Sequence, residues 1–170
     1  MRSSERVLDS MRAWIFFVAV AVSPLLMAAP KADFVLVKKS ERKLYLLDHG
    51  RPFKEYKVAL GKAPRGHKMR EGDKRTPEGR YVLDFKNENS DYYKSIRISY
   101  PNTVDSALAR RFGYKPGGAI MIHGQRQEAE YSPYVMQAFN WTDGCIAVTN
   151  DEMDEIWAAV EVGTPIEILP

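Results

Sequence analysis

The sequence predicts a single mostly-β domain that carries two or three short helices. Short runs rich in β-branched and aromatic residues recur between residues 34 and 169, and turn residues separate them. Apolar residues at helical spacing, next to residues suited to cap a helix, occur at two places. With 170 residues and a hydrophobic content of 45%, the chain can bury one sizeable core but not two.

The first 29 residues differ in kind from the rest. Three arginines precede an uncharged run over residues 13–22, and the small residues Ala28 and Ala29 follow. This order is typical of a secretory signal, so we expect residues 1–29 to be a signal peptide that is cleaved near Ala28 or Ala29. The alternative is an uncleaved membrane anchor, although Pro24 interrupts the uncharged stretch and makes a spanning helix marginal.

The domain over residues 30–170 opens with three strand-like runs, at residues 34–37, 43–47 and 53–60. Short polar segments separate these runs, which predicts a β-meander. His49 lies in the second turn, where we expect its side chain to be exposed to solvent.

A long loop follows over residues 61–79, where glycine and proline interrupt a charged segment. Long ordered loops are often functional. We expect His67 to be exposed among the basic residues of this loop. The loop ends in Thr76-Pro77-Glu78-Gly79, in which proline fixes φ and glycine permits a tight turn into a strand at residues 81–85. A further strand is predicted at residues 94–100.

The first helix is predicted to begin at Asn102 or Thr103, either of which can cap it, and to end at Gly113. Three apolar residues recur within it at four-residue spacing, which is typical of a helix with one buried face. We therefore expect this stripe to pack in the core: Val104, Leu108 and Phe112.

A buried strand at residues 119–122 is predicted to lead into His123 and Gly124. Residues 125–139, which are polar and aromatic, then connect this histidine to the segment that contains the cysteine. Two interpretations stay open for the connection: a lid over a cleft, or a surface loop with its own short helix.

The second helix has a clear start, because Thr149 and Glu152 are spaced as a capping box. Gly163 marks its end, and a last strand is predicted at residues 165–169. Apolar residues at i, i+3, i+4 and i+7 predict its buried face: Met153, Ile156, Trp157 and Val160.

The chemistry centres on Cys145, the only cysteine of the chain. In an exported protein a single cysteine cannot form an internal disulfide, so it pairs with another chain, is reactive, or is a buried inert thiol. A thiol attacks carbonyl groups as the thiolate, and a histidine within hydrogen-bonding reach can take its proton. His123 is the candidate base, although its spacing from Cys145 is equally compatible with a core histidine.

Glycine lies next to both candidate residues. Gly144 permits a tight backbone turn, so the amides of Asp143, Gly144 and Cys145 can point at one developing oxyanion. Gly124 leaves the space around the imidazole of His123 open.

The distribution of charge and the spacing of the histidines argue against two other kinds of site. The formal charge is +3, from 25 basic and 22 acidic residues that are spread along the chain, whereas a nucleic-acid surface needs clustered basic residues. The three histidines are scattered without metal-ligand spacing, so we expect no metal and no other cofactor.

Four short motifs occur in a fixed order along the domain: Gly61-Lys62, Thr76 to Tyr81, His123-Gly124, and Gly144-Cys145 followed by Asn150. Together they resemble the L,D-transpeptidase (YkuD) catalytic domain family. The resemblance covers about residues 33–169 and implies a YkuD-like β-sandwich or mixed-sheet fold.

The resemblance implies a cysteine enzyme of the bacterial envelope or periplasm that contributes to cell wall biogenesis and cell shape. In this family the thiolate attacks the carbonyl carbon of the third residue of a peptidoglycan stem tetrapeptide, and that residue is usually meso-diaminopimelate. The terminal D-alanine leaves, and the acyl group passes to an amine.

Carried over by position, Cys145 is the nucleophile and His123 the general base. The Gly124 carbonyl orients the imidazole, and Gly144 contributes an oxyanion amide. Substrate binding is assigned to Thr142, Asp143, Asn150 and Thr76. We expect a monomer that acts on stem peptides, binds no nucleic acid and meets the membrane only through its N-terminal segment.

Two departures from the family pattern concern the surroundings of the thiol. Thr142-Asp143 stands where a Ser or Thr followed by His is usual, and Ala147 stands where an arginine is frequent. A carboxylate close to a thiol raises its pKa, which opposes activation. Asp143 therefore leaves open a non-catalytic wall-binding module. Hydrolysis through the same acyl-enzyme, as an L,D-carboxypeptidase or amidase, also stays open, because the choice of acceptor depends on cleft shape and water exclusion.

Overall fold

The computed structural model describes residues 29–126 and 131–170, so the predicted signal peptide lies almost entirely outside the described residues. The described part contains eight strands and three short helices, which confirms the mostly-β class. The strands are β1 (Phe34–Lys38), β2 (Lys43–Asp48), β3 (Arg51–Lys57), β4 (Gly79–Ser90), β5 (Tyr93–Ile98), β6 (Met121–His123), β7 (Ile146–Ala147) and β8 (Pro165–Leu169), and the helices are α1 (Thr103–Arg111), α2 (Pro133–Met136) and α3 (Asn150–Ala159).

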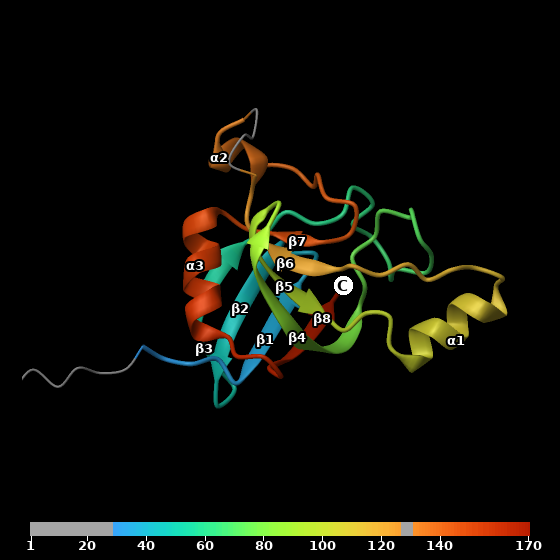
Figure 1. The fold of residues 1–170 in the computed structure, drawn as a ribbon, viewed down its shortest axis with the longest axis horizontal. Helices are drawn as coiled ribbons and strands as arrows, with labels where there is room; N and C mark the ends of the chain where they lie inside the picture. Colours follow the sequence, from blue (N-terminus) through green and yellow to red (C-terminus); the bar gives the residue numbers. More distant parts are fainter. Residues whose placement is uncertain (1–28, 127–130) are drawn as a thin grey trace, which may run out of the picture.

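The strands form a mixed sheet in the order β3-β2-β1-β8-β4-β5-β6-β7. β1 is parallel to β8 and β6 is parallel to β7, whereas the other neighbours are antiparallel. The long strand β4 pairs with β8 through its first four residues and with β5 from Leu83 onward, with a register shift between Leu83 and Phe85. β4 is therefore shared between two parts of the sheet, one around β1 and β8 and one around β5 and β6 (Figure 1).

The backbone that follows β3 crosses to the strand at the other end of this order. Ala59 and Ala147 exchange two backbone hydrogen bonds, of 2.9 and 2.8 Å, and the N–H of Lys62 donates to the carbonyl of Thr142 at 2.9 Å. The crossing places the start of the loop over residues 61–79 beside the segment that carries Cys145.

Alternate strand residues and one face of α3 form the core. α3 lies along one side of the sheet (Figure 1), and its capping box between Thr149 and Glu152 is present as predicted. The helix ends at Ala159, before the predicted Gly163, because Val160 is already extended and bridges to Ala32. Side chains that are at most 1% exposed include Val35, Val37, Leu44, Leu46, Leu83, Ile96, Ile98, Ile122, Ile146, Met153, Ile156, Ile166 and Ile168.

The prediction that the apolar stripe of α1 packs in the core is wrong. Val104 is 71% exposed and Phe112 is 56% exposed, whereas Asp105 and Ala109 are the buried residues of the helix. α1 projects away from the sheet at the side opposite α3 (Figure 1). Its attachment is polar, because Asp105 completes a capping box with Asn102 and also lies 3.2 Å from Nε2 of His67.

The segment over residues 125–139 contains the short helix α2, as the surface-loop interpretation expects, and residues 127–130 of it lie outside the described residues. Gln137, which follows α2, is buried, and its side-chain amide donates to the carbonyl of Ala147 at 3.2 Å. In the described part of the chain, no helix is long and apolar enough to cross a membrane.

Two buried lysines, Lys39 before the loop over residues 61–79 and Lys68 within it, form hydrogen bonds that hold the loop together. The ammonium of Lys39 donates to the carbonyls of Gly66 and Thr76 and to the Glu78 carboxylate, at 2.7 to 3.1 Å. The ammonium of Lys68 binds Asp73 at 2.9 Å. These bonds satisfy charges that burial would otherwise penalise heavily.

His67 also helps to hold this loop together, so the prediction that it is exposed is wrong. Its Nδ1 accepts the N–H of Glu78 at 3.0 Å, its Nε2 faces Asp105, and 23% of its side chain is exposed. His49 is 90% exposed, as expected.

The loop over residues 61–79 lies in direct backbone contact with the turn before Cys145. A β-carbon added at Gly61 would collide with the carbonyl oxygen of Lys74 and lie 3.1 Å from Cα of Gly144. A β-carbon at Gly144 would lie 2.8 Å from the Arg75 carbonyl oxygen, and Gly144 also has a φ of +134°, which side chains disfavour. Only glycine fits at either position without movement of the backbone.

We expect Gly61→Ala to lower the free energy of unfolding by about 2 kcal/mol, because the added methyl group overlaps rigid backbone rather than a flexible side chain. Chemical denaturation followed by circular dichroism measures this loss. Gly118→Ala is the matched control: its β-carbon would meet only atoms at 3.9 Å, so its stability should stay within about 0.5 kcal/mol of the unaltered protein. Equal losses in the two variants would contradict the close backbone packing.

Candidate active site

His123 is the last residue of β6, and Cys145 directly precedes β7, the strand that pairs with β6 in parallel. Ile122 pairs with Ile146 and His123 pairs with Ala147, and both isoleucines point into the core. Extending the side-chain alternation of β7 back by one residue places Cys145 on the same face as His123, as a diagonal neighbour, and ideal strand spacing puts the two Cα atoms about 8 Å apart. Both line one cavity of about 520 Å³.

The imidazole of His123 is held through its Nδ1 atom. This nitrogen lies 2.6 Å from the carbonyl oxygen of Gly124, a backbone acceptor, so Nδ1 carries the proton and donates it. Nε2 is then the unprotonated nitrogen that is available as a base. Ser95 of β5, which pairs with His123, also lines the cavity and is buried.

Burial keeps both groups of the pair uncharged at neutral pH. Removal from water lowers the pKa of His123 to about 4, against the opposing hydrogen bond to Gly124, and the residue is 4% exposed. Burial likewise raises the pKa of the Cys145 thiol. The N–H of Met121 and the ammonium of Lys68 lower it, and Asp143 raises it by a smaller amount than burial does. The resting pair is therefore a thiol and a neutral imidazole.

The turn before Cys145 is held by the hydroxyl of Thr142. This hydroxyl donates to the carbonyl of Cys145 at 2.7 Å and accepts the N–H of Gly144 at 3.2 Å. The sulfur of Cys145 lies 3.5 Å from the carbonyl oxygen of Ala119. Thr142 lines the cavity, but its side chain is buried and serves the turn.

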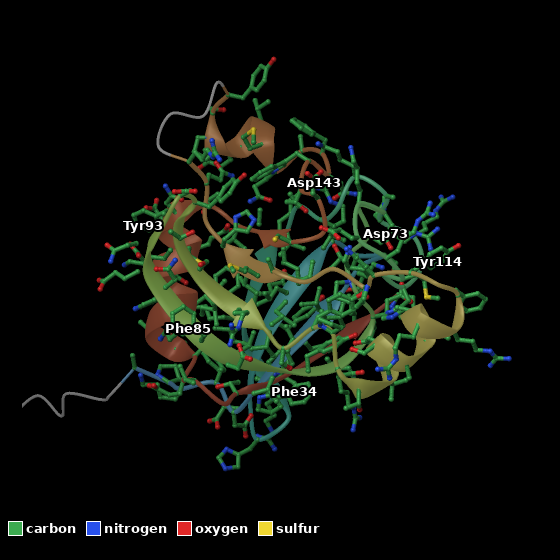
Figure 2. All side chains as sticks on the ribbon, turned by 45° about the vertical axis from the view of Figure 1, so that its right-hand side comes forward. Phe34, Asp73, Phe85, Tyr93, Tyr114 and Asp143 are labelled. Carbon is green, nitrogen blue, oxygen red and sulfur yellow. The ribbon has the colours of Figure 1, made fainter. Side chains whose placement is uncertain are left out.

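Asp143 lies at the rim of the cavity rather than against the thiol. Its side chain is 75% exposed and pairs with the ammonium of Lys62 at 3.3 Å. Figure 2 shows Asp143 at the surface of the molecule. The neighbouring family difference, Ala147, is fully buried, and its backbone bonds to Ala59.

Asn150, Gly124 and Thr76 lie around the site without forming the surface of the cavity. The carbonyl oxygen of the Asn150 side chain accepts the N–H of Gln125 at 2.7 Å and would lie 2.5 Å from a β-carbon at Gly124. Gly124 therefore permits close packing rather than open space. Thr76 is fully buried, and its hydroxyl accepts the N–H of Gly61 at 3.1 Å.

Several residues of the cavity were missed by the sequence reasoning. Tyr92 and Trp141 flank His123, and the end of the β4–β5 hairpin supplies one polar wall, through Asn87, Asn89, Ser90 and Asp91. The available signal was the polar stretch between the predicted strands at residues 81–85 and 94–100, which the structure shows to be a continuous hairpin.

One group of described residues has the spacing to ligate a metal ion: Asp33, Asp48 and His49. All three are exposed, and none of them lines the cavity that holds Cys145.

Comparisons with known proteins identify the family and the fold of the chain. The model of the L,D-transpeptidase catalytic domain, YkuD, matches residues 32–168. The protein named "Putative L,D-transpeptidase YafK" of Escherichia coli (strain K12) is 33% identical over 134 residues, which are 75% of this chain and 46% of that protein. The protein named "Putative L,D-transpeptidase YqjB" of Bacillus subtilis (strain 168) is 28% identical over 82% of this chain and 72% of its own length.

Solved structures show the same fold. The helical cell shape determining protein Pgp2 of Campylobacter jejuni has a TM-score of 0.59 and 26% identity, over 79% of this chain and 46% of that one. An L,D-transpeptidase of Xylanimonas cellulosilytica, at 15% identity and a TM-score of 0.52, covers 82% of this chain and 61% of its own and supports the fold alone. The chain thus spans about half the length of the first relatives it matches. From the family model and the shared fold, the chain belongs to the L,D-transpeptidase (YkuD) catalytic domain family.

Proposed function

We propose that this protein is a cysteine-dependent L,D-transpeptidase that acts on peptidoglycan stem tetrapeptides. The observation that carries the proposal is that His123, at the end of β6, and Cys145, directly before the parallel strand β7, line one cavity, with Nε2 of the histidine unprotonated. Membership of the family supports this reaction class, and the cell-shape role named for Pgp2 supports a substrate in the cell wall.

In the proposed acylation step, Nε2 of His123 takes the proton of the Cys145 thiol while the sulfur attacks the donor carbonyl. The tetrahedral intermediate collapses, the carbon–nitrogen bond to D-alanine breaks, and the imidazolium returns its proton to the leaving amine. A thioester on Cys145 and free D-alanine result.

In the proposed transfer step, an acceptor amine enters the same cavity and attacks the thioester carbonyl. Its surplus proton passes to Nε2 of His123, the carbon–sulfur bond breaks, and the departing thiolate takes that proton back. A neutral imidazole is needed at the start of both steps, which the burial of His123 favours.

The assignment of the Gly144 N–H as an oxyanion donor stays a prediction, because this N–H already has a hydrogen-bond partner. Its N–H donates to the Thr142 hydroxyl at 3.2 Å, so that amide must share or release this long bond to reach an oxyanion. We also propose residues 1–29 as an export signal and the periplasm or cell envelope as the location, because the substrate lies there.

Incubation of the protein with purified tetrapeptide muropeptides, followed by chromatographic separation, tests the proposed reaction. We expect cross-linked dimers and released D-alanine, and we expect Cys145→Ala to lose activity by at least about 1,000-fold because the nucleophile is gone. Tripeptides without dimers would instead assign hydrolysis. Full activity of Cys145→Ala would contradict cysteine catalysis, and His49→Ala, at an exposed turn, is the control that should stay active.

The pH dependence of Cys145 acylation tests the state of the pair. With the pKa of His123 at about 4 and that of Cys145 raised, the acylation rate by a carbapenem should be flat from about pH 5.5 to pH 8.5 and fall only in more acidic solution. The sign follows from burial, which disfavours the protonated imidazole and so extends the neutral form to lower pH. Mass spectrometry of the intact protein measures the rate, and a midpoint near 6.5 would contradict the buried neutral imidazole.

Asp143→Asn should change the rate of Cys145 alkylation by iodoacetamide at pH 7.5 by less than about threefold. Asp143 is exposed and paired with Lys62, and burial raises the pKa of the thiol more than this carboxylate does. A tenfold faster reaction would show that the carboxylate itself suppresses the thiolate.

A further inference from the structure

The imidazole of His123 lies against two aromatic side chains that come from different parts of the chain and that also approach each other. The ring of Tyr92 is 4.6 Å away, centre to centre, and inclined by 44°, and the ring of Trp141 is 5.7 Å away at 69°. Tyr92 and Trp141 also approach each other, at 6.0 Å. Tyr92 therefore packs against the imidazole at a tilt, and Trp141 contacts it in an edge-to-face arrangement.

The position of Tyr92 relative to His123 is set by close backbone packing. A β-carbon at Gly124 would lie 3.2 Å from the carbonyl oxygen of Tyr92 and 3.2 Å from Cβ of Tyr93, so the hairpin end rests directly on the residue after the histidine. The N–H of Gly124 donates to the carbonyl of Lys94 at 3.2 Å.

The same hairpin is also fastened to α3. The hydroxyl of Tyr93 and the ammonium of Lys94 both donate to Asp154, at 2.9 and 2.7 Å. The outer side of Tyr92 is covered by the guanidinium of Arg126, which lies 4.8 Å from the ring centre, a distance at which a cation attracts an aromatic face.

A single hydrogen bond leaves the imidazole one free motion. The bond from Nδ1 to the Gly124 carbonyl fixes one atom of the ring, but the ring can still swing about it and carry Nε2 away from Cys145. Aromatic neighbours at 4.6 and 5.7 Å restrict that swing and exclude water from the ring. Neither effect requires a contact between Tyr92 and the substrate.

We propose that Tyr92 is a positioning residue for His123, and that together with Trp141 it holds the imidazole with Nε2 toward Cys145 and shields the ring from water. The inference deepens the proposed function, since it rests on His123 acting as the base. The burial that lowers the pKa of His123 is consistent with this shielding. The titratable or charged groups that share the cavity or lie against Tyr92 are Lys62, Asp91, Asp143, Cys145 and Arg126.

The test compares Tyr92→Leu, which removes the ring, with Tyr92→Phe, which keeps it. The acylation rate of Cys145 by a carbapenem is measured from pH 4 to pH 9 by intact-protein mass spectrometry, a readout that needs no muropeptide turnover. Nitrogen-15 spectra of labelled histidine report the tautomer and titration of His123 in the same variants, and thermal unfolding reports stability.

For Tyr92→Leu we expect the acylation rate at pH 7.5 to fall between about 10- and 100-fold, because the base is misplaced. The pH below which the acylation rate falls and the titration midpoint of His123 should both rise toward 6.5 by at least about one pH unit, because water reaches the ring. The acylation rate of Tyr92→Phe should stay within about threefold of that of the unaltered protein, and it should fall at the same acidic pH. Tyr114→Leu, at an aromatic residue outside this cavity, is the matched control and should change neither.

Loss of thermal stability without a shift of the His123 titration would overturn the proposal, because that is the signature of packing alone. An unchanged rate and titration in Tyr92→Leu would overturn it as well. If Tyr92→Leu does not fold, Trp141→Leu carries the same test at the second aromatic neighbour of the imidazole, with a shift in the same direction. A protein that turns over no muropeptide, yet shows these shifts, would refute the proposed function and leave the positioning role standing.

Discussion

The site depends on a contact between backbones that leaves no space for a side chain. Gly61 and Gly144 face each other and the carbonyls of Lys74 and Arg75, so the loop and the turn that carries Cys145 pack backbone against backbone. The loop in turn keeps its shape because the buried ammonium groups of Lys39 and Lys68 bind its carbonyls and carboxylates. Side chains that never enter the cavity thus determine where the thiol lies.

The position of the site also depends on the parallel pairing of β6 with β7. This pairing brings His123 and the residue before β7, Cys145, to one cavity and commits the alternate residues, Ile122 and Ile146, to the core. The strands therefore serve stability and chemistry at once. The polar contributions at the site are short-range: the Gly124 carbonyl orients the imidazole, and the Thr142 hydroxyl closes the turn. Asp143, the main departure in sequence, stays at the rim with Lys62.

Local patterns in the sequence were sufficient for most of the fold. Alternation predicted the strands, and spacing alone found the caps of α1 and α3, because these features depend on neighbours in the chain. The stripe of Val104, Leu108 and Phe112 failed because periodicity shows that a helix has an apolar face, not that another element covers it. Thr76 was assigned to substrate, but its hydroxyl bonds to Gly61 across the loop. Tyr92 was missed because its contact with His123 exists only after the hairpin folds against Gly124.

The place of β8 in the sheet has a consequence for the order of folding. This last strand lies between β1 and β4, near the middle of the sheet, and pairs with the first strand in parallel. A chain that emerges from its N-terminus first has both neighbours of β8 before it has β8 itself. The larger part of the sheet is therefore incomplete until residues 165–169 are available, and early folding is limited to local hairpins such as β1–β2 and β4–β5.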